Sequence, residues 1–364
     1  MRAITRRLPR APLNEIARIR EASPLRILII RHERIGDLLM MTPMIRGLAL
    51  SREEITIDVL ASPENAPVLD GNPHISEVRL FQRMKWWTYP ALWRTLRRAR
   101  YDVVIDGRVN PKRVTATTPL LLYMTGARVR VGAAIEGKEG LYDSPVTIDR
   151  HAHFSEQSTA LASAVGVDPA GIDLRPDIFV SETEQRCAEE SWIAATKSSS
   201  NGVRLLVNIS AAEPLRRWPD ERYIALIAGV RESIPDAVPL IVASPADVAK
   251  ASAIADASAA SYVPTSLREA IALVATSDMV FTPDTAISHI ASAFPKPVVV
   301  LMLSMPDAPG LLSPDACIPW RTPGRIVRSP SQSLAAISAD AALSELLAAL
   351  KDVARERASE FSNV

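Results

Sequence analysis

Short apolar runs that alternate with helical stretches are the feature that most limits the fold of this chain. Residues 26–31 (RILIIR) are typical of a buried parallel strand, and residues 37–50 have the spacing of an amphipathic helix. The alternation then repeats. Further strands are expected at 55–60, 77–81, 102–106, 128–132, 204–209, 239–243, 278–282 and 297–303. This pattern predicts an α/β fold with parallel sheets wrapped by helices.

The strand candidates fall into two sets, separated by a polar stretch at residues 197–202. A chain of 364 residues is also too long for one ordinary core and fits two domains of about 150 residues each. We therefore predict two doubly wound domains, residues 25–180 and 181–332. The other segments are predicted as a basic N-terminal extension at 1–24, a C-terminal helix at 333–354 that packs back on the first domain, and a disordered tail at 355–364.

Charge and cysteine content exclude several classes of protein. A net charge of +1 argues against nucleic acid as a partner. Cys187 and Cys317 are too few for a disulfide framework or a four-thiolate metal site, so a reducing cytoplasm is expected. No apolar run reaches the length of about 18 residues that crosses a bilayer. His151 and His153 have the spacing of metal ligands, but no acidic or thiol cluster accompanies them, which favours an ordinary loop.

Ligands of open α/β sheets bind beyond the carboxyl ends of the strands, so the residues after each predicted strand are the candidates. The first strand is followed by Gly36, which permits a tight turn, and by Asp37, where a helix begins. Taken alone, this position leaves a helix-capping role for Asp37 open. Arg216 and Arg217 follow the first strand of the second half. Their guanidinium groups suit phosphate oxygens, and the alternative is a solvated surface pair.

A third candidate segment, residues 282–289 (TPDTAISH), runs from a strand end into a helix. The N-terminus of a helix offers free backbone N–H groups to an anion. The alternative gives Asp284 or Thr285 a capping role and His289 a packing role.

Four short motifs occur in order along the chain. They are Ile35-Gly36-Asp37 with Thr42-Pro43, Asn65-Ala66-Pro67 with Gly71-Asn72-Pro73, Arg216-Arg217-Trp218-Pro219, and Asp284-Thr285-x-x-x-His289. Together they resemble glycosyltransferase family 9, the lipopolysaccharide heptosyltransferases, over roughly residues 25–350. The resemblance implies the GT-B fold, in which two Rossmann-like domains face a cleft. It also implies that the first domain binds the acceptor and the second binds the donor nucleotide sugar.

The same resemblance implies roles for single residues. Asp37 takes the place of the base that deprotonates the acceptor hydroxyl, and Arg34 stands on the acceptor side. The implied donor-binding residues are Ser210, Arg216, Arg217, Asp247, Thr265, Leu267, Asp284, Thr285, Ala286 and His289. Among them, Asp247 falls where the family holds the ribose, and Thr265 and Leu267 fall where the adenine packs. No Asp-x-Asp sequence occurs, so neither a metal ion nor another cofactor is expected, and arginines would stabilise the leaving diphosphate.

Three departures from the family pattern keep alternatives open, one of them at residues 303–307 (LSMPD), where the family has Phe-Gly-Pro-Thr-Asp. Ala286 replaces a glycine of the motif, and Ala212 replaces a serine or threonine of the phosphate loop. The predicted function is an inverting transfer of a heptose or related sugar from an ADP-sugar to a lipopolysaccharide core or similar glycolipid. The alternatives are a transferase that uses a GDP- or UDP-hexose, and a non-catalytic sugar-nucleotide-binding or scaffold member of the family.

An aromatic and basic segment at residues 83–100 points to a membrane partner. Three of the six tryptophans lie here, among six basic side chains. The residues predicted to meet the acceptor or the membrane are Arg83, Lys85, Trp86, Trp87, Arg94 and Arg97. Such a mixture suits the inner-leaflet surface of a membrane or an anionic glycolipid, and the alternative is that the tryptophans are buried in the core. We therefore expect a cytoplasmic enzyme, peripheral on the inner face of the inner membrane.

Overall fold

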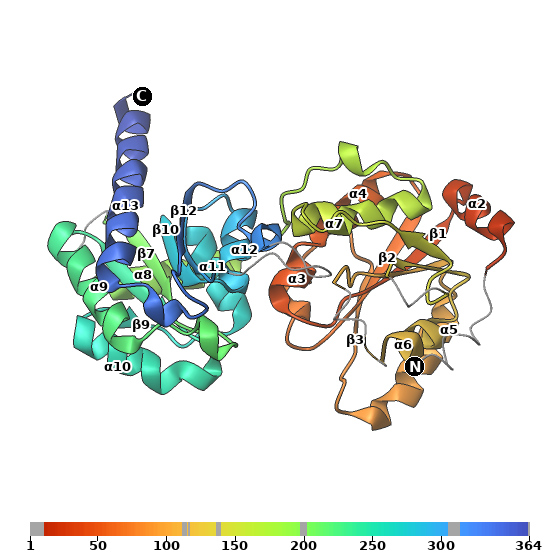
Figure 1. Cartoon of the computed structure of the whole chain (residues 1–364), viewed down its shortest axis with the longest axis horizontal. Helices are drawn as coiled ribbons and strands as arrows, with labels where there is room; N and C mark the ends of the chain where they lie inside the picture. Colours follow the sequence, from red (N-terminus) through yellow and green to blue (C-terminus); the bar gives the residue numbers. More distant parts are fainter. Residues whose placement is uncertain are drawn as a thin grey trace. The chain divides into compact units, whose positions relative to one another are not determined.

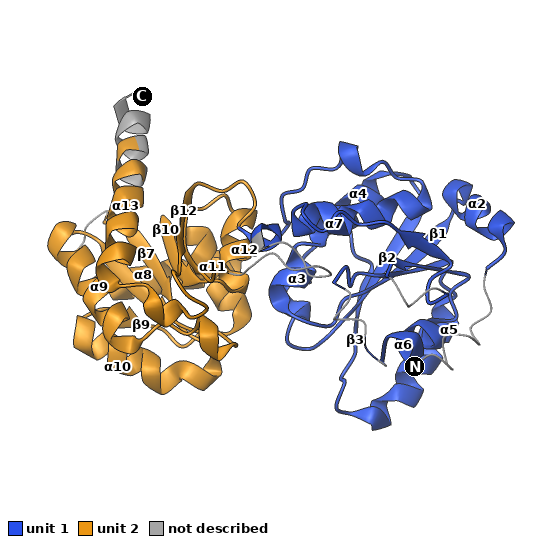
Figure 2. Cartoon of the chain, viewed as in Figure 1, with its two compact units in different colours: residues 1–179, 307–318 blue, residues 180–306, 319–364 orange. Residues whose placement is uncertain are grey.

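The computed structural model describes residues 11–110, 115, 117–135, 140–196, 202–304 and 314–362. The chain divides into two compact units, with the main boundary after Phe179 (Figure 2). Unit 1 comprises the described residues up to Phe179 and also residues 314–318. Unit 2 comprises the described residues from Val180 onward, apart from that short segment.

Unit 1 is built on a six-stranded sheet in which every pairing is parallel (Figure 1). Its strands are β1 (Leu25–Ile30), β2 (Ile55–Ala61), β3 (Glu77–Leu80), β4 (Val103–Asp106), β5 (Val129–Ala133) and β6 (Ser144–Val146). The order across the sheet is β3-β2-β1-β4-β5-β6, so Ile30 at the end of β1 pairs with Asp106 at the end of β4. The strand order reverses between β1 and β4, and ligands of doubly wound sheets bind at such a switch point.

Helices connect these strands. They are α2 (Leu13–Glu21), α3 (Ile35–Leu39), α4 (Thr42–Leu50), α5 (Tyr89–Ala99), α6 (Thr117–Thr125) and α7 (Phe154–Ala160), with the short 3₁₀ helices η1 (Ala66–Leu69), η2 (Trp86–Thr88), η4 (Leu161–Val165), η5 (Pro169–Gly171) and η8 (Pro314–Cys317). The single helix predicted at residues 37–50 is two helices, with a break at Met40 and Met41. The cause is Pro43, which lacks a backbone N–H donor and is accommodated in the first turn of a new helix.

Unit 2 repeats this topology with a second all-parallel sheet. Its strands are β7 (Arg204–Asn208), β8 (Val238–Val242), β9 (Ser261–Tyr262), β10 (Met279–Pro283), β11 (Val298–Met302) and β12 (Gly324–Arg328). Its helices are α8 (Glu182–Ala195), α9 (Asp220–Ser233), α10 (Val248–Ser258), α11 (Leu267–Thr276), α12 (Ala286–Ala293) and α13 (Ala339–Ser362), with η6 (Pro214–Arg216), η7 (Pro245–Asp247) and η9 (Leu334–Ala336). The order β12-β11-β10-β7-β8-β9 places the switch point between β7 and β10.

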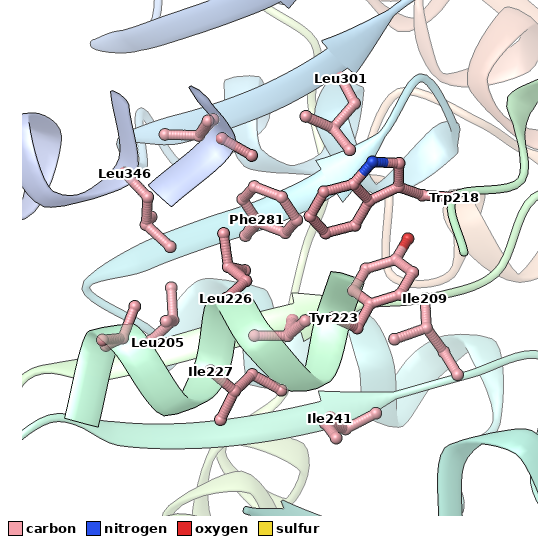
Figure 3. Close-up of a cluster of buried hydrophobic side chains, with 14 of the residues drawn as sticks. Leu205, Ile209, Trp218, Tyr223, Leu226, Ile227, Ile241, Phe281, Leu301 and Leu346 are labelled. Carbon is pink, nitrogen blue, oxygen red and sulfur yellow. The ribbon is translucent and has the colours of Figure 1, made fainter. Parts of the chain in front are cut away.

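The core of unit 2 is centred on three aromatic rings (Figure 3). The ring of Trp218 lies 4.8 Å from that of Tyr223 and 5.7 Å from that of Phe281, between centroids. The indole Nε1 of Trp218 donates a hydrogen bond to the carbonyl of Ile337 at 3.0 Å. Aromatic side chains contribute large buried areas, and a buried indole needs a partner for its N–H. Trp218 therefore anchors the loop that carries Arg216.

The C-terminal helix corrects two predictions. α13 packs on α9 and β12 of unit 2, not on the first domain, and its Leu346 and Leu350 are part of the buried core of unit 2. An apolar stripe shows that a helix is covered on one side, but it does not show by which unit. The predicted disordered tail is also wrong as far as Ser362, because α13 continues to that residue and contains neither proline nor glycine. Residues 363–364 lie outside the described residues.

Residues 314–318 belong to unit 1, which corrects the predicted extent of the second domain, residues 181–332. Nε2 of His153 lies 2.8 Å from the carbonyl oxygen of Ile318, while Nδ1 of the same ring accepts a hydrogen bond from the backbone of Ser155. His153 is the N-cap of α7, so the His-x-His pair has a structural role at this position. The buried ring contributes a contact that no sequence pattern predicts.

Candidate active site

Asp37 lies near the switch point of unit 1, in α3, and is held by an arginine. Its Oδ2 forms an ion pair with Nη2 of Arg31, the residue that follows β1. The side chain of Arg31 is 1% exposed and that of Asp37 is 19% exposed. Nη1 of Arg31 also donates to the carbonyl of Gly107, which follows β4, at 3.2 Å. Arg31, in the loop after β1, therefore links the carboxylate of Asp37 to the loop after β4.

The capping alternative for Asp37 is not what the structure shows. The N-cap of α3 is Arg34, no side chain caps the helix, and Asp37 is the third residue inside it. Arg34 also makes the turn, because its φ of 51° lies in the left-handed region that few residues other than glycine adopt. Gly36 lies in α3 and is buried, so the prediction that it makes the turn is wrong. The exposed side chain of Arg34 lies one residue before α3.

Sequence reasoning missed a buried polar cluster beside Asp37. Nε and Nη2 of Arg108 donate to the two carboxylate oxygens of Asp106 at 2.6 and 2.9 Å, and the hydroxyl of Tyr142 donates to Oδ2 of Asp106 at 2.6 Å. Burial raises the pKa of Tyr142 well above its ordinary value, and the Asp106 carboxylate raises it further. Asp106 ends a predicted strand and Gly107 and Arg108 follow it, so the strand-end rule that selected Asp37 could have found these residues.

His32 completes this cluster as a neutral ring. Burial lowers the pKa of His32 to about 4, and the nearby guanidinium of Arg108 lowers it as well. The ring packs edge-on against Phe81, with 4.8 Å between the ring centroids. At neutral pH the imidazole is uncharged.

In unit 2, the structure brings the two predicted phosphate-binding segments together. Nη1 of Arg216 lies 2.9 Å from Oδ2 of Asp284 and donates to the backbone carbonyl of Asp284 at 3.2 Å. Arg216 comes from the loop after β7, and Asp284 comes directly after β10. These strands flank the switch point of the second sheet. The arginine is thus fixed at the edge where a ligand of this sheet would bind.

A hydroxyl and amide network supports the start of α12. Nδ2 of Asn208 donates to the hydroxyls of Thr282 and Thr285 at 2.9 and 3.1 Å. Thr285 is the N-cap residue of α12, but its side chain does not cap the helix, so the capping alternative is not observed for it. Ala286 is the first residue of α12, and His289 is buried one turn later. The network orients the strand end and leaves the helix N-terminus without a side-chain cap.

A second network joins the loops after β7 and β8. The backbone N–H of Ser244 donates to Oγ of Ser210 at 2.8 Å, and Oγ of Ser244 donates to Oδ2 of Asp247 at 2.8 Å. Burial alone would raise the pKa of Asp247, but hydrogen bonds from the two serines and the charge of Arg217 lower it. Asp247 is therefore a hydrogen-bond acceptor at neutral pH. Thr265 and Leu267 follow β9 and, among the described residues, stand outside this network.

Comparison with known proteins decides the family. The model of glycosyltransferase family 9 (heptosyltransferase) matches residues 89–317, more than half of the chain. The chain belongs to this family. It is 24% identical over 327 residues to lipopolysaccharide heptosyltransferase 2 of Salmonella typhimurium, which covers 84% of this chain and 88% of that protein. The predicted enzyme class, glycosyltransferase, is thereby confirmed.

Two solved structures have the same fold as this family 9 glycosyltransferase. A family 9 glycosyltransferase from Veillonella parvula superposes with a TM-score of 0.74 at 16% identity, over 90% of this chain and 97% of that chain. The ADP-heptose lps heptosyltransferase II of E. coli superposes with a TM-score of 0.70 at 22% identity, over 92% of this chain and 100% of that chain. The predicted α/β fold of the GT-B type, with two Rossmann-like domains, is confirmed.

The tryptophan-rich segment of this glycosyltransferase is at the surface. The exposed fractions are 72% for Trp86, 61% for Trp87 and 45% for Trp93, so the alternative that they are buried in the core is wrong. Arg83, Lys85 and Arg94 are exposed beside them. Arg97 is exposed as well, but its Nη2 donates to the carbonyl of Tyr123 at 2.9 Å and its guanidinium lies 5.2 Å from the centroid of that ring. The guanidinium of Arg97 is therefore already bound to the end of α6.

Two further observations concern metal ions and membranes. Within the part of the chain that the structure describes, no three His, Cys, Asp or Glu side chains gather where they could hold a metal ion. None of the helices in the same ranges combines the length and the apolar content needed to cross a bilayer.

Proposed function

We propose that this chain is an inverting heptosyltransferase that moves a heptose, or a related sugar, from an ADP-linked donor to a lipopolysaccharide core or a similar glycolipid. The observation that carries the proposal is the state of Asp37, whose carboxylate is partly exposed and bound by Arg31 instead of capping its helix. The relatives supply the substrates, since one is a lipopolysaccharide heptosyltransferase and another is named for ADP-heptose.

The chemistry needs a base on the acceptor side. In an inverting transfer, the acceptor oxygen attacks the anomeric carbon while the bond from that carbon to the diphosphate oxygen breaks. A sugar hydroxyl is too weak an acid to attack unaided at neutral pH, and a carboxylate that takes its proton typically gains a factor of about 10²–10⁴ in rate. In this proposal Asp37 accepts that proton, and the new glycosidic bond forms as ADP leaves.

The leaving ADP needs a positive environment on the donor side. Arg216 at the switch point of unit 2 and the uncapped N-terminus of α12 are the groups proposed to stabilise the developing charge of the diphosphate. Asp247, whose carboxylate already accepts hydrogen bonds from serine hydroxyls, is proposed to accept from the ribose. Thr265 and Leu267 are proposed to line the adenine, and no resident cofactor takes part.

The replacement of glycine by Ala286 does not favour the non-catalytic alternative. Ala286 begins a regular helix, and it is not among the residues whose φ is positive. A Cβ is therefore compatible with the backbone at this position. Donor identity can be tested by thermal shift with ADP, GDP and UDP, because a ligand that binds the native state stabilises it according to its affinity. A larger shift with GDP or UDP than with ADP would favour the alternative donors.

The test of the proposed mechanism is Asp37→Asn. Asparagine keeps the shape of the side chain but cannot take a proton, so turnover should fall by about two orders of magnitude or more. The affinity for ADP, measured by calorimetry, should stay unchanged because the proposed nucleotide site lies in unit 2. The matched control is Asp70→Asn, which alters an exposed aspartate of the same unit. Turnover of Asp37→Asn near that of the control would remove Asp37 from the mechanism.

The exposed tryptophans and basic residues of η2 and α5 are proposed to dock on an anionic membrane surface. Trp86 and Trp87 supply apolar area, and Lys85 and Arg94 supply positive charge. An enzyme that glycosylates a lipid acceptor gains from such contact, since the acceptor is concentrated at that surface. The proposed location is the cytoplasmic side of the inner membrane. The basic residues of the N-terminal extension up to Arg10 lie outside the described residues.

A further inference from the structure

The backbone of Arg31 is fixed by hydrogen bonds. It follows the last residue of β1, and its backbone N–H donates to the carbonyl of Leu60 at 3.0 Å. Its own carbonyl accepts a hydrogen bond from Nδ2 of Asn65 at 3.2 Å. Asn65 is itself buried and begins one of the motifs seen in the sequence. The backbone at Arg31 is therefore hydrogen-bonded to β2 and to the loop that follows β2.

The guanidinium group is contacted at three points. Nη1 donates to the carbonyl of Gly107, Nη2 pairs with the carboxylate of Asp37, and the central carbon lies 5.7 Å from the centroid of the Phe154 ring. A planar group that donates in two directions and stacks on a ring has little freedom to rotate. The position of its Nη2 is thus set by the sheet and by α7, and the carboxylate of Asp37 follows that position.

The two partners of the ion pair between Arg31 and Asp37 differ in burial. The cation is almost fully buried, while the anion is partly open to solvent. A buried charge is tolerated only when it is paired, so Arg31 retains its carboxylate partner. Oδ2 of Asp37 is the atom bound by Arg31. Within the described residues Oδ1 has no hydrogen-bond partner, which leaves that oxygen for an acceptor hydroxyl.

We infer that Arg31 is a positioning residue that holds the carboxylate of Asp37 in the orientation needed to take the acceptor proton. The inference rests on the proposed function, in which Asp37 is the base. Arginine is needed because a lysine ammonium is a single point of charge and cannot reach the carbonyl of Gly107 and the carboxylate together in a fixed fork. A misplacement of about 1 Å in a reacting group can cost a factor of about 10² in rate.

The test is Arg31→Lys in the full chain, with ADP-heptose as donor and a heptose-free lipopolysaccharide as acceptor. The charge is kept, so kcat should fall by about ten- to a hundredfold while both KM values and the calorimetric affinity for ADP change less than about twofold. The matched control is Arg46→Lys. Arg46 is a partly buried arginine of the same unit that pairs with Asp177, and this variant should keep the wild-type kcat.

The outcomes separate this inference from the proposed function. A wild-type kcat for Arg31→Lys, or a loss of kcat shared by Arg46→Lys, would overturn the positioning role. Loss of turnover in Asp37→Asn together with normal turnover in Arg31→Lys would leave the proposed function standing and reject only this inference. Normal turnover in Asp37→Asn would reject the proposed function itself, and with it the need for a positioning residue.

A second variant covers the case in which Arg31→Lys does not fold. Phe154→Leu keeps the arginine and both of its polar contacts but removes the ring beneath the guanidinium. If the fixed orientation of Arg31 matters, kcat should fall severalfold with both KM values unchanged. A folded Phe154→Leu protein with the wild-type kcat would overturn the inference.

Discussion

Arg216 and Asp284 form an ion pair across the switch point of the second sheet, with 2.9 Å between Nη1 and Oδ2. The pair joins the loop after β7 to the end of β10 and sets the direction of the arginine before any nucleotide binds. Asp284 alone would repel a diphosphate at this edge. Its pairing with Arg216 removes that repulsion while the rest of the guanidinium stays at the strand ends.

The first prediction concerns this arginine. Arg216→Ala should weaken ADP binding by about 1.5–3 kcal/mol, the value of a hydrogen bond to a charged group, and by more if Asp284 is left to repel the phosphates. Titration calorimetry measures the change. Arg231→Ala is the control, because Arg231 is an arginine of the same unit that donates to an exposed backbone carbonyl, that of Ala259 at the end of α10. Equal ADP affinities in Arg216→Ala and in the control would contradict the proposed placement of the diphosphate.

The second prediction concerns the membrane surface. Trp86→Ala with Trp87→Ala should abolish most co-sedimentation with liposomes that contain anionic lipid, because both indoles are more than half exposed. Arg94→Ala should lower binding about fivefold at low salt, which corresponds to about 1 kcal/mol for one basic residue at an anionic surface. Ile193→Ala, which removes an exposed apolar side chain of unit 2, is the control. Binding that ignores lipid charge and salt would speak against this surface.

The third prediction is a pH dependence caused by His32. Its pKa is about 4 in the folded chain, below the ordinary 6.5, so the unfolded chain binds more protons between these values. The free energy of unfolding should therefore fall as the pH drops from about 6.5 to about 4, by up to roughly 3 kcal/mol from this group. Thermal melts of wild type and His32→Gln across this range measure the difference. The exposed His151, changed to Gln, is the control, and parallel curves for all three proteins would refute the prediction.

The fourth prediction tests the corrected position of the C-terminal helix. Leu346 is buried against the core of unit 2, so Leu346→Ala should lower the free energy of unfolding by about 2–5 kcal/mol. Urea unfolding measures this loss. Lys351→Ala changes an exposed residue of the same helix and should stay within about 0.5 kcal/mol of wild type. A small effect of Leu346→Ala would mean that α13 does not complete this core.

The central strands of both sheets could be predicted because each contains a short apolar run that is buried on both faces. Of the four edge strands only β3, expected at 77–81, could be predicted. β6, β9 and β12 are short or partly exposed and lack such a run, and they are recognised only by their pairing with β5, β8 and β11. The same limit applies to α13, whose apolar stripe predicted a covered face but not the unit that covers it.

The site was predictable where one segment carries the signal and not where two distant segments meet. Asp37 and Arg216 follow strands and stand in recognisable motifs. Arg31 contacts Gly107 across 76 residues of sequence, and this contact exists only because β1 and β4 are neighbours in the sheet. The sequence contains both strand ends but not their adjacency. The roles assigned to these residues stay predictions until the variants are measured.

Residues 314–318 belong to unit 1 although unit 2 precedes and follows them in the sequence, and this matters for chimeras that combine units from different members of this family. A chimera with a single junction after Phe179 would give unit 1 a foreign version of that segment. The partner of His153 there is a main-chain carbonyl, that of Ile318, and every amino acid carries this group. Grafts of unit 2 from one relative onto unit 1 of another should therefore keep this hydrogen bond whatever residue the relative has at that position.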